Sequence, residues 1–156
     1  MKIMETLVIP SIRLIGLKLK HKTWNEGGQS AIDCGLLWQQ FELENIKDKI
    51  PGKLGEDRYS VYFEYEGDHT RPYSYFIGYK VEAQIENPAG LDEVFIPEGI
   101  YIRYVAKGIM PDCVARVWRE IWNSDLNRAY TFDYEKYDER SADWNNAEAD
   151  VFIAIK

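Results

Sequence analysis

The chain has 156 residues, 46% of them hydrophobic and 29% charged, a composition typical of one globular domain with a packed core. Its formal net charge is −7 at pH 7 and its Lys and Arg residues are scattered, which argues against binding to a nucleic-acid backbone. No apolar run reaches the roughly 20 residues of a membrane-spanning helix, and the first residues lack the apolar region of a signal peptide. We therefore expect one domain over residues 1–156, located in the cytoplasm.

Aromatic residues make up 14% of the chain, which contains 5 Trp, 11 Tyr and 6 Phe. Aromatic side chains beyond the needs of a core often line ligand sites or interfaces, because they give a large contact area at a low entropic cost. The two cysteines, Cys34 and Cys113, have no Cys or His neighbours at metal-ligand spacing, so we interpret both as small buried hydrophobic residues. Neither a metal site nor a cofactor is expected.

The first half of the chain contains a strand, a helix and a hairpin. Pro10 is expected at the start of the first strand or on a sheet edge, and Ser30 is the candidate N-cap of the helix. The apolar stripe of this helix, spaced i, i+3, i+4 and i+7, consists of Cys34, Leu37, Trp38 and Phe41. The predicted elements are, in order, a strand over residues 6–20, a helix over about 31–47, and an antiparallel hairpin over 58–66 and 74–84.

The second half repeats this plan. Its first strand turns at Gly108, and Pro111 suits the first turn of the helix that follows. The stripe of that helix consists of Val114, Val117, Trp118 and Ile121. The predicted elements are, in order, a strand over residues 94–107, a helix over about 111–126, and strands over 128–137 and 149–155, joined by a polar linker over 138–146.

The two halves also match in detail. The corresponding pairs are Ile9-Pro10 with Ile96-Pro97, Gly28 with Gly108, and Trp38 with Trp118. Three matches in one register indicate an internal duplication of a β-α-β-β unit, with a first repeat over about 5–85 and a second over about 93–156. We predict an α+β fold with pseudo-twofold symmetry, in which antiparallel sheet carries two helices on one face and a central cleft lies where the halves meet.

The stretch over residues 128–137 carries the candidate chemistry. Aromatic residues at Tyr130, Phe132 and Tyr134 alternate with polar ones, the period-two pattern of a strand with one buried face. Glu135 lies in this pattern, and a carboxylate among aromatic rings is suited to capture a bulky organic cation. The alternative is that Glu135 is an ordinary solvated strand residue.

Four motifs carry a resemblance to a known family. They are Ile96-Pro-x-Gly-x-Tyr-x-x-Tyr104 leading to Gly108, Trp118 within its helix, Phe132-x-Tyr-Glu-x-Tyr137, and the closing Asp150-Val-Phe-Ile-Ala154. In this order and spacing the chain resembles, over nearly its whole length, the GyrI-like small-molecule-binding domain. This is the effector-binding domain family of bacterial transcription activators, which also occurs as stand-alone proteins.

The resemblance implies a duplicated β-α-β-β fold and a cleft that takes lipophilic, often cationic compounds. It also implies that an acidic residue at the position of Glu135 faces the charge of the ligand. The sequence departs from the family at Ala154, where the family usually has Pro. Because the first strand begins almost at Met1, we expect no preceding DNA-binding module, and hence a stand-alone binder without direct nucleic-acid contacts.

Strand parity extends the candidate site beyond Glu135. If Val151 and Ile153 face the core, Phe152 shares the face of Glu135, and Phe76 is placed in the cleft by the same reasoning, although the opposite parity stays open for it. The two equivalent tryptophans are either plain core or the floor of the cleft. The predicted ligand-binding residues are Glu135, Trp38, Tyr62, Tyr75, Phe76, Trp118 and Phe152.

Two other functions are weaker alternatives. Acidic residues such as Asp138, Glu139 and Asp143 motivate an interaction protein that modulates a larger partner, such as DNA gyrase or the transcription machinery. Hydrolysis of reactive small molecules is the other alternative. No catalytic residue is expected, because neither His21 nor His69 is placed by any pattern beside a Ser or Cys nucleophile.

Overall fold

The computed structural model describes residues 4–156, which form eight strands and two α helices. The strands make one sheet in the order β1-β6-β8-β7-β3-β4-β2-β5, antiparallel throughout, as the α+β prediction requires. In chain order the elements are β1 (Met4–Ile9), β2 (Ile12–Lys18), α1 (Gln29–Leu43), β3 (Lys53–Phe63), β4 (Ser74–Val81), β5 (Asp92–Ile96), β6 (Gly99–Gly108), α2 (Asp112–Trp122), β7 (Phe132–Tyr137) and β8 (Ala147–Ala154). No helix within residues 4–156 is long and apolar enough to cross a membrane.

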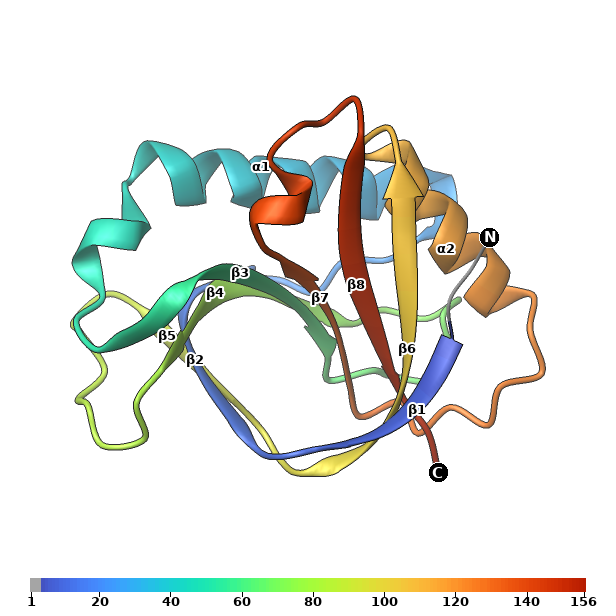
Figure 1. Ribbon diagram of the computed structural model, residues 1–156, viewed down its shortest axis with the longest axis horizontal. Helices are drawn as coiled ribbons and strands as arrows, with labels where there is room; N and C mark the ends of the chain where they lie inside the picture. Colours follow the sequence, from blue (N-terminus) through green and yellow to red (C-terminus); the bar gives the residue numbers. More distant parts are fainter. Residues whose placement is uncertain (1–3) are drawn as a thin grey trace.

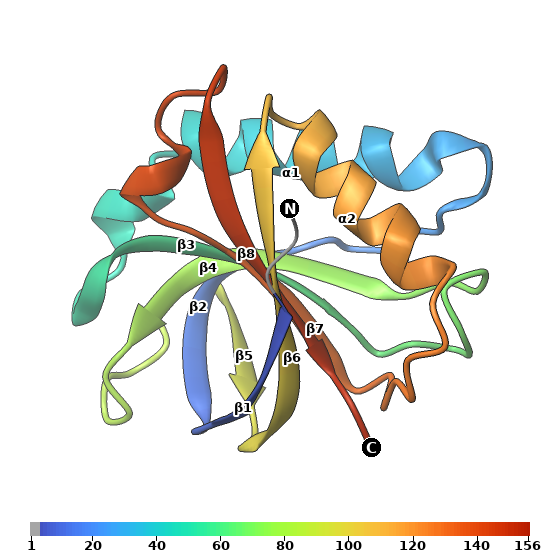
Figure 2. The ribbon, with the colours of Figure 1, turned by 45° about the vertical axis from the view of Figure 1, so that its right-hand side comes forward.

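Both helices lie on the same side of the sheet, whose outer strands curl away from them (Figures 1 and 2). The concave side encloses one hydrophobic cluster, whose buried residues all lie in strands and include Leu14, Val61 and Tyr134. A second cluster joins α1 to β2 and β4, and a third joins α2 to β6 and β8. The helices therefore cover the two wings of the sheet rather than its middle.

The strand order confirms the predicted duplication and its pseudo-twofold symmetry. If β1 to β4 are exchanged with β5 to β8, the order of the sheet is reproduced in reverse. The symmetry axis passes between β3 and β7, which pair with each other at the centre. Each unit also lends its first strand to the other, since β1 pairs with β6 and β5 pairs with β2.

The predicted single strands over 6–20 and 94–107 are wrong, because each is two strands. The first breaks after Ile9 at Pro10, and the second breaks at Pro97. Proline has no backbone N–H to donate to a sheet and its ring restricts the backbone, so the chain leaves one ladder there and joins another. Ile9 pairs with Gly99 in β6, whereas Ile12 pairs with Ile96 in β5.

The helix boundaries also differ from the predictions. Helix α1 begins at Gln29 after Gly28, whose left-handed φ of 75° starts the turn, so Ser30 is not the N-cap. It ends at Leu43, and Asn45 with a φ of 52° separates it from a short 3-10 helix over Ile46–Lys49. Helix α2 ends at Trp122, before the predicted limit at about residue 126.

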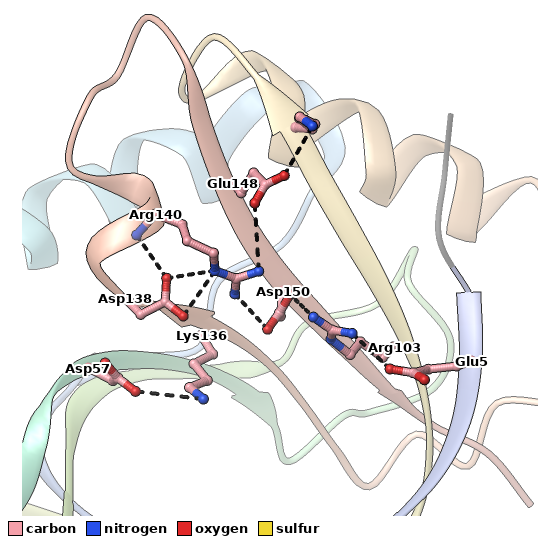
Figure 3. Close-up of polar contacts among 9 residues, drawn as sticks. Glu5, Asp57, Arg103, Lys136, Asp138, Arg140, Glu148 and Asp150 are labelled. Atoms are coloured by element: carbon pink, nitrogen blue, oxygen red, sulfur yellow. Dashed lines mark hydrogen bonds and ion pairs between the residues drawn. The ribbon is translucent and has the colours of Figure 1, made fainter.

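A network of ion pairs fastens the linker between β7 and β8 to the sheet (Figure 3). The buried carboxylate of Asp150 in β8 accepts hydrogen bonds from Arg103 Nη2 (3.0 Å) and Arg140 Nη2 (2.8 Å). Arg140 lies in the short 3-10 helix Glu139–Ser141 and also binds Asp138, whereas Arg103 in β6 binds Glu5 in β1. The polar linker predicted over 138–146 is thus anchored by a charged side chain at its start.

Strands β2 and β4 approach each other closely at Gly16 and Gly78, which are paired in the ladder. A Cβ atom on Gly16 would lie 1.9 Å from the carbonyl oxygen of Ile77 and 2.5 Å from the Cα of Gly78. Both atoms belong to the backbone, so the strands can accommodate a methyl group only by moving apart.

We expect Gly16→Ala to lower the free energy of unfolding by at least about 1–3 kcal/mol, the usual range for overpacking. Urea denaturation followed by tryptophan fluorescence measures this difference. Gly35→Ala is the matched control, because Gly35 lies in α1 with open space where the added methyl group would sit, and alanine favours a helix by about 1 kcal/mol. Equal stabilities of the two variants would contradict the close approach.

Candidate ligand-binding site

The centre of the helix-covered face is left open by the packing of the two helices. Helix α1 packs mainly on β2 and β4, and α2 packs mainly on β6 and β8, so the space above the middle pair, β3 and β7, is bordered by both helices. The register of that pair sets Ser60 opposite Glu135 and Tyr62 opposite Asp133. Directly opposed residues share a face of the sheet, so all four side chains point toward the space between the helices.

This space is a cavity of about 1200 Å³. Its walls come from α1 and α2, and its floor from β3, β7 and the chain around the start of β4. Most of the lining is apolar or aromatic, as is usual for sites that bind organic molecules. The aromatic lining consists of Trp38, Tyr62, Tyr65, Tyr73, Tyr75, Trp118, Trp122, Tyr137 and Trp144.

Glu135 lies at the floor of the cavity, and only 3% of its surface is exposed. Its Oε1 accepts hydrogen bonds from Ser60 Oγ (2.7 Å) and from the hydroxyl of Tyr137. Its Oε2 accepts from the hydroxyl of Tyr62 (2.8 Å) and from Nε1 of Trp118 (2.6 Å). Every one of these donors is neutral, so the carboxylate is held in place without being neutralised.

A second layer of contacts positions the donors. The hydroxyl of Tyr75 accepts a hydrogen bond from Nε1 of Trp38 at 2.9 Å. The ring of Tyr62 packs between Tyr75 and Trp118, with centroid separations of 5.0 and 4.8 Å. Because these rings are locked against each other, the hydroxyl and indole donors stay aimed at the carboxylate.

A second buried carboxylate lies two residues earlier in β7 and has a different environment. Asp133 accepts hydrogen bonds from Arg128 Nη2 (2.7 Å) and from the backbone N–H of Ala154 (2.8 Å). Burial opposes the charge of Arg128, but Asp133 raises the pKa of this guanidinium above its ordinary value. Glu135 has no cationic group within 4 Å in the part of the chain that the structure describes. Of the two acids, Asp133 is paired and Glu135 is not.

The structure brings five of the seven predicted residues together on the cavity: Glu135, Trp38, Tyr62, Tyr75 and Trp118. The placement of Phe76 and Phe152 in the cleft is wrong. Both belong to the cluster on the concave face of the sheet, and Phe152 stacks there on Tyr134 at 4.7 Å.

The error lies in the assumed parity of the last strand. In the ladder between β7 and β8, Glu135 pairs with Val151, whereas Phe152 pairs with Tyr134. Val151 therefore shares the face of Glu135, and Phe152, together with Asp150 and Ala154, faces away from it. Likewise Tyr75 and Ile77 in β4 face α1, which turns Phe76 to the other side.

Sequence reasoning missed two donors to Glu135, Ser60 and Tyr137, as well as the buried cation Arg128. Tyr137 lies two residues after Glu135, so strand periodicity alone indicates that the two share a face. No such signal exists for Ser60, because its position depends on the pairing register of strands that are far apart in the sequence. Cys34, predicted to be buried, is only half-buried on the cavity wall, where its partial burial still raises the pKa of its thiol.

No group of three or more His, Cys, Asp or Glu side chains that could hold a metal ion occurs among residues 4–156.

A scaffold of two β-β-α-β-β units that encloses an aromatic cavity around a buried carboxylate is typical of a protein that binds small effector molecules. The chain belongs to the Cass2 family of integron-associated effector binding proteins, which matches residues 7–155. This confirms the family resemblance deduced from the four sequence motifs.

Individual relatives agree with this assignment. YobU of Bacillus subtilis (strain 168), a protein named for a role in transcriptional regulation, is 27% identical over 124 residues, covering 77% of this chain and 78% of YobU. The integron cassette protein VCH_CASS2 from the mobile metagenome of Vibrio cholerae has the same fold, with a TM-score of 0.75, 24% identity, and coverage of 98% of this chain and 95% of that one. The protein SAV2435, solved with bound tetraphenylphosphonium, aligns with a TM-score of 0.79 and 19% identity over 98% of this chain and 93% of its own.

The tyrosines around Glu135 should stay protonated at unusually high pH. Burial, and next the charge of Glu135, raises the pKa of Tyr62 and Tyr137 well above the ordinary value of 10. The pKa of these tyrosines is higher in the folded than in the unfolded state. Their contribution to the free energy of unfolding is therefore complete below pH 10 and is lost as the pH rises further. Above pH 10 the free energy of unfolding should fall by about 1.4 kcal/mol per pH unit for each such tyrosine.

Absorbance at 295 nm, recorded against pH for folded and guanidinium-unfolded protein, measures how many of the 11 tyrosines ionise. We expect the unfolded chain to titrate completely near pH 10 and the folded chain only in part. Complete titration near pH 10 with an unchanged circular dichroism spectrum would show that the donors to Glu135 are not protected.

Proposed function

We propose that this protein is an effector-binding protein whose cavity takes lipophilic organic cations, with Glu135 as the counter-charge. The observation that carries the proposal is a buried carboxylate that faces an aromatic cavity and has only neutral hydrogen-bond donors around it. Trp38, Tyr62, Tyr75 and Trp118 are the proposed aromatic ligand contacts.

The energetics favour a cationic ligand over a neutral one. A buried charge without a counter-ion is costly, and the cost falls when a ligand brings the opposite charge close to it. The surrounding rings add cation–π attraction of roughly 0.5–2 kcal/mol each where the cation is desolvated. A neutral molecule of the same shape gains contact area but leaves the charge of Glu135 uncompensated.

One protein of similar structure supports the same ligand class. SAV2435 was solved with tetraphenylphosphonium, a lipophilic cation that cannot donate hydrogen bonds. Membership of an effector-binding family supports binding, rather than catalysis, as the role of the cavity.

The geometry of the site weakens the alternatives. Four donors hold Glu135 in one orientation, an arrangement that suits a fixed charge better than a base that must take up and release a proton. The acidic surface that motivated a partner-binding role is partly neutralised, since Arg140 binds Asp138. A role in regulating transcription would require a partner that distinguishes the ligand-bound protein from the ligand-free protein.

The direct test compares Glu135→Gln with the wild type by isothermal titration calorimetry, using tetraphenylphosphonium and neutral triphenylphosphine oxide. Glutamine keeps the size of the side chain but removes the charge. We expect the affinity for the phosphonium to fall by about 10- to 100-fold, equivalent to about 1.4–2.8 kcal/mol, because the attraction between the two charges is lost. Binding of the phosphine oxide should be unchanged or stronger.

Glu139→Gln is the matched control, because it removes the same charge from an exposed position outside the cavity lining. Its affinity for the phosphonium should equal that of the wild type. The proposal fails if Glu135→Gln binds the phosphonium as tightly as the wild type, or if the wild type does not distinguish the cation from the neutral compound.

A further inference from the structure

The hydrogen-bonding capacity of Glu135 is already fully used within the protein. An ionised carboxylate offers about four acceptor positions, two on each oxygen. Ser60 and Tyr137 occupy those of Oε1, and Tyr62 and Trp118 occupy those of Oε2. A cation that enters the cavity therefore meets the negative charge of Glu135 without finding a free acceptor on it.

This arrangement separates two kinds of organic cation. A protonated primary amine carries three N–H donors, and in a desolvated cavity each donor without an acceptor weakens binding. What the cavity offers around Glu135 is aromatic faces and phenolic oxygens, which are weaker acceptors than a carboxylate. A quaternary ammonium or phosphonium ion has no such donors. The negative charge of Glu135 and the cation–π attraction of the aromatic rings are sufficient to bind it.

We infer that the site selects organic cations by their lack of hydrogen-bond donors, and that the hydroxyls of Tyr62 and Tyr137 are specificity determinants. Both tyrosines line the cavity, so their hydroxyls occupy acceptor positions of Glu135 that a ligand N–H would otherwise reach. The inference rests on the proposed function and adds to it the chemical class of the ligand: quaternary and delocalised cations rather than protonated primary and secondary amines.

A matched ligand series tests the inference in the wild-type protein. Anthracen-9-ylmethyl-trimethylammonium, the corresponding protonated dimethylamine and the protonated primary amine share one ring system and one positive charge at pH 7, but carry no, one and three N–H donors. Titration calorimetry should show that the quaternary ion binds at least about tenfold more tightly than the primary ammonium, the size expected for unsatisfied donors.

Added methyl groups also make a ligand more lipophilic. The ratio of the affinity for the quaternary ion to that for the primary ammonium must therefore be compared between the wild type and variants that free an acceptor position. Tyr62→Phe keeps the ring but frees an acceptor position on Oε2, and Tyr137→Phe does the same on Oε1. In either variant the preference for the quaternary ion should fall by at least about threefold, because the primary ammonium can now bind Glu135 directly. Tyr101→Phe, which removes one phenol on the opposite face of the sheet, should leave the ratio at the wild-type value.

The outcomes separate this inference from the proposed function. If no member of the series binds the wild type and tetraphenylphosphonium does not bind either, the proposed function fails. If the cations bind but the preference for the quaternary ion is the same in the wild type, Tyr62→Phe and Tyr137→Phe, the selection by donor number is overturned while the cation site stands. Testing two variants guards against the loss of either one through misfolding, and circular dichroism shows which of them folds.

Discussion

The hydrogen bonds that converge on Glu135 are the constraint on which the site depends. They come from β3, from α2 and from β7 itself, so one side chain joins a helix to the two central strands. Because all four donors are neutral, they satisfy the carboxylate oxygens without cancelling the charge. The protein thereby keeps a buried negative charge in a fixed position. The four hydrogen bonds make this charge tolerable, and a bound cation would lower its free energy further.

The symmetric scaffold produces an asymmetric site. Trp38 and Trp118 match in the sequence repeat, but Trp38 donates to Tyr75 whereas Trp118 donates to Glu135. On the central strand pair, the residue opposite Glu135 is Ser60, a neutral donor. The fold thus places one buried carboxylate without a cationic partner at the floor of a cavity built by two similar units, which suits a ligand with a single positive centre.

Two acids on one strand illustrate how environment decides the role of a residue. Asp133 and Glu135 are both buried and lie on the same face of β7. Asp133 binds Arg128 and the backbone N–H of Ala154, so its charge is compensated within the protein. Glu135, without a cationic neighbour among the described residues, is the one that can serve a ligand.

Much of the scaffold follows from local pattern. The stripes around Trp38 and Trp118, the period-two strands and the repeated Ile-Pro pairs identify two helices, a duplication and the α+β class, because each signal depends only on neighbouring residues. Glu135 stood out for the same reason, as an acid in an aromatic strand.

What the tertiary structure alone decided is which distant segments meet and in which register. It split the strands at Pro10 and Pro97 and exchanged the first strands between the repeats. It also placed Ser60 beside Glu135 and turned Phe76 and Phe152 to the other face of the sheet. A slip of one residue in strand register reverses every side chain, and that register is set by pairing between segments far apart in the chain, which periodicity along the sequence does not encode.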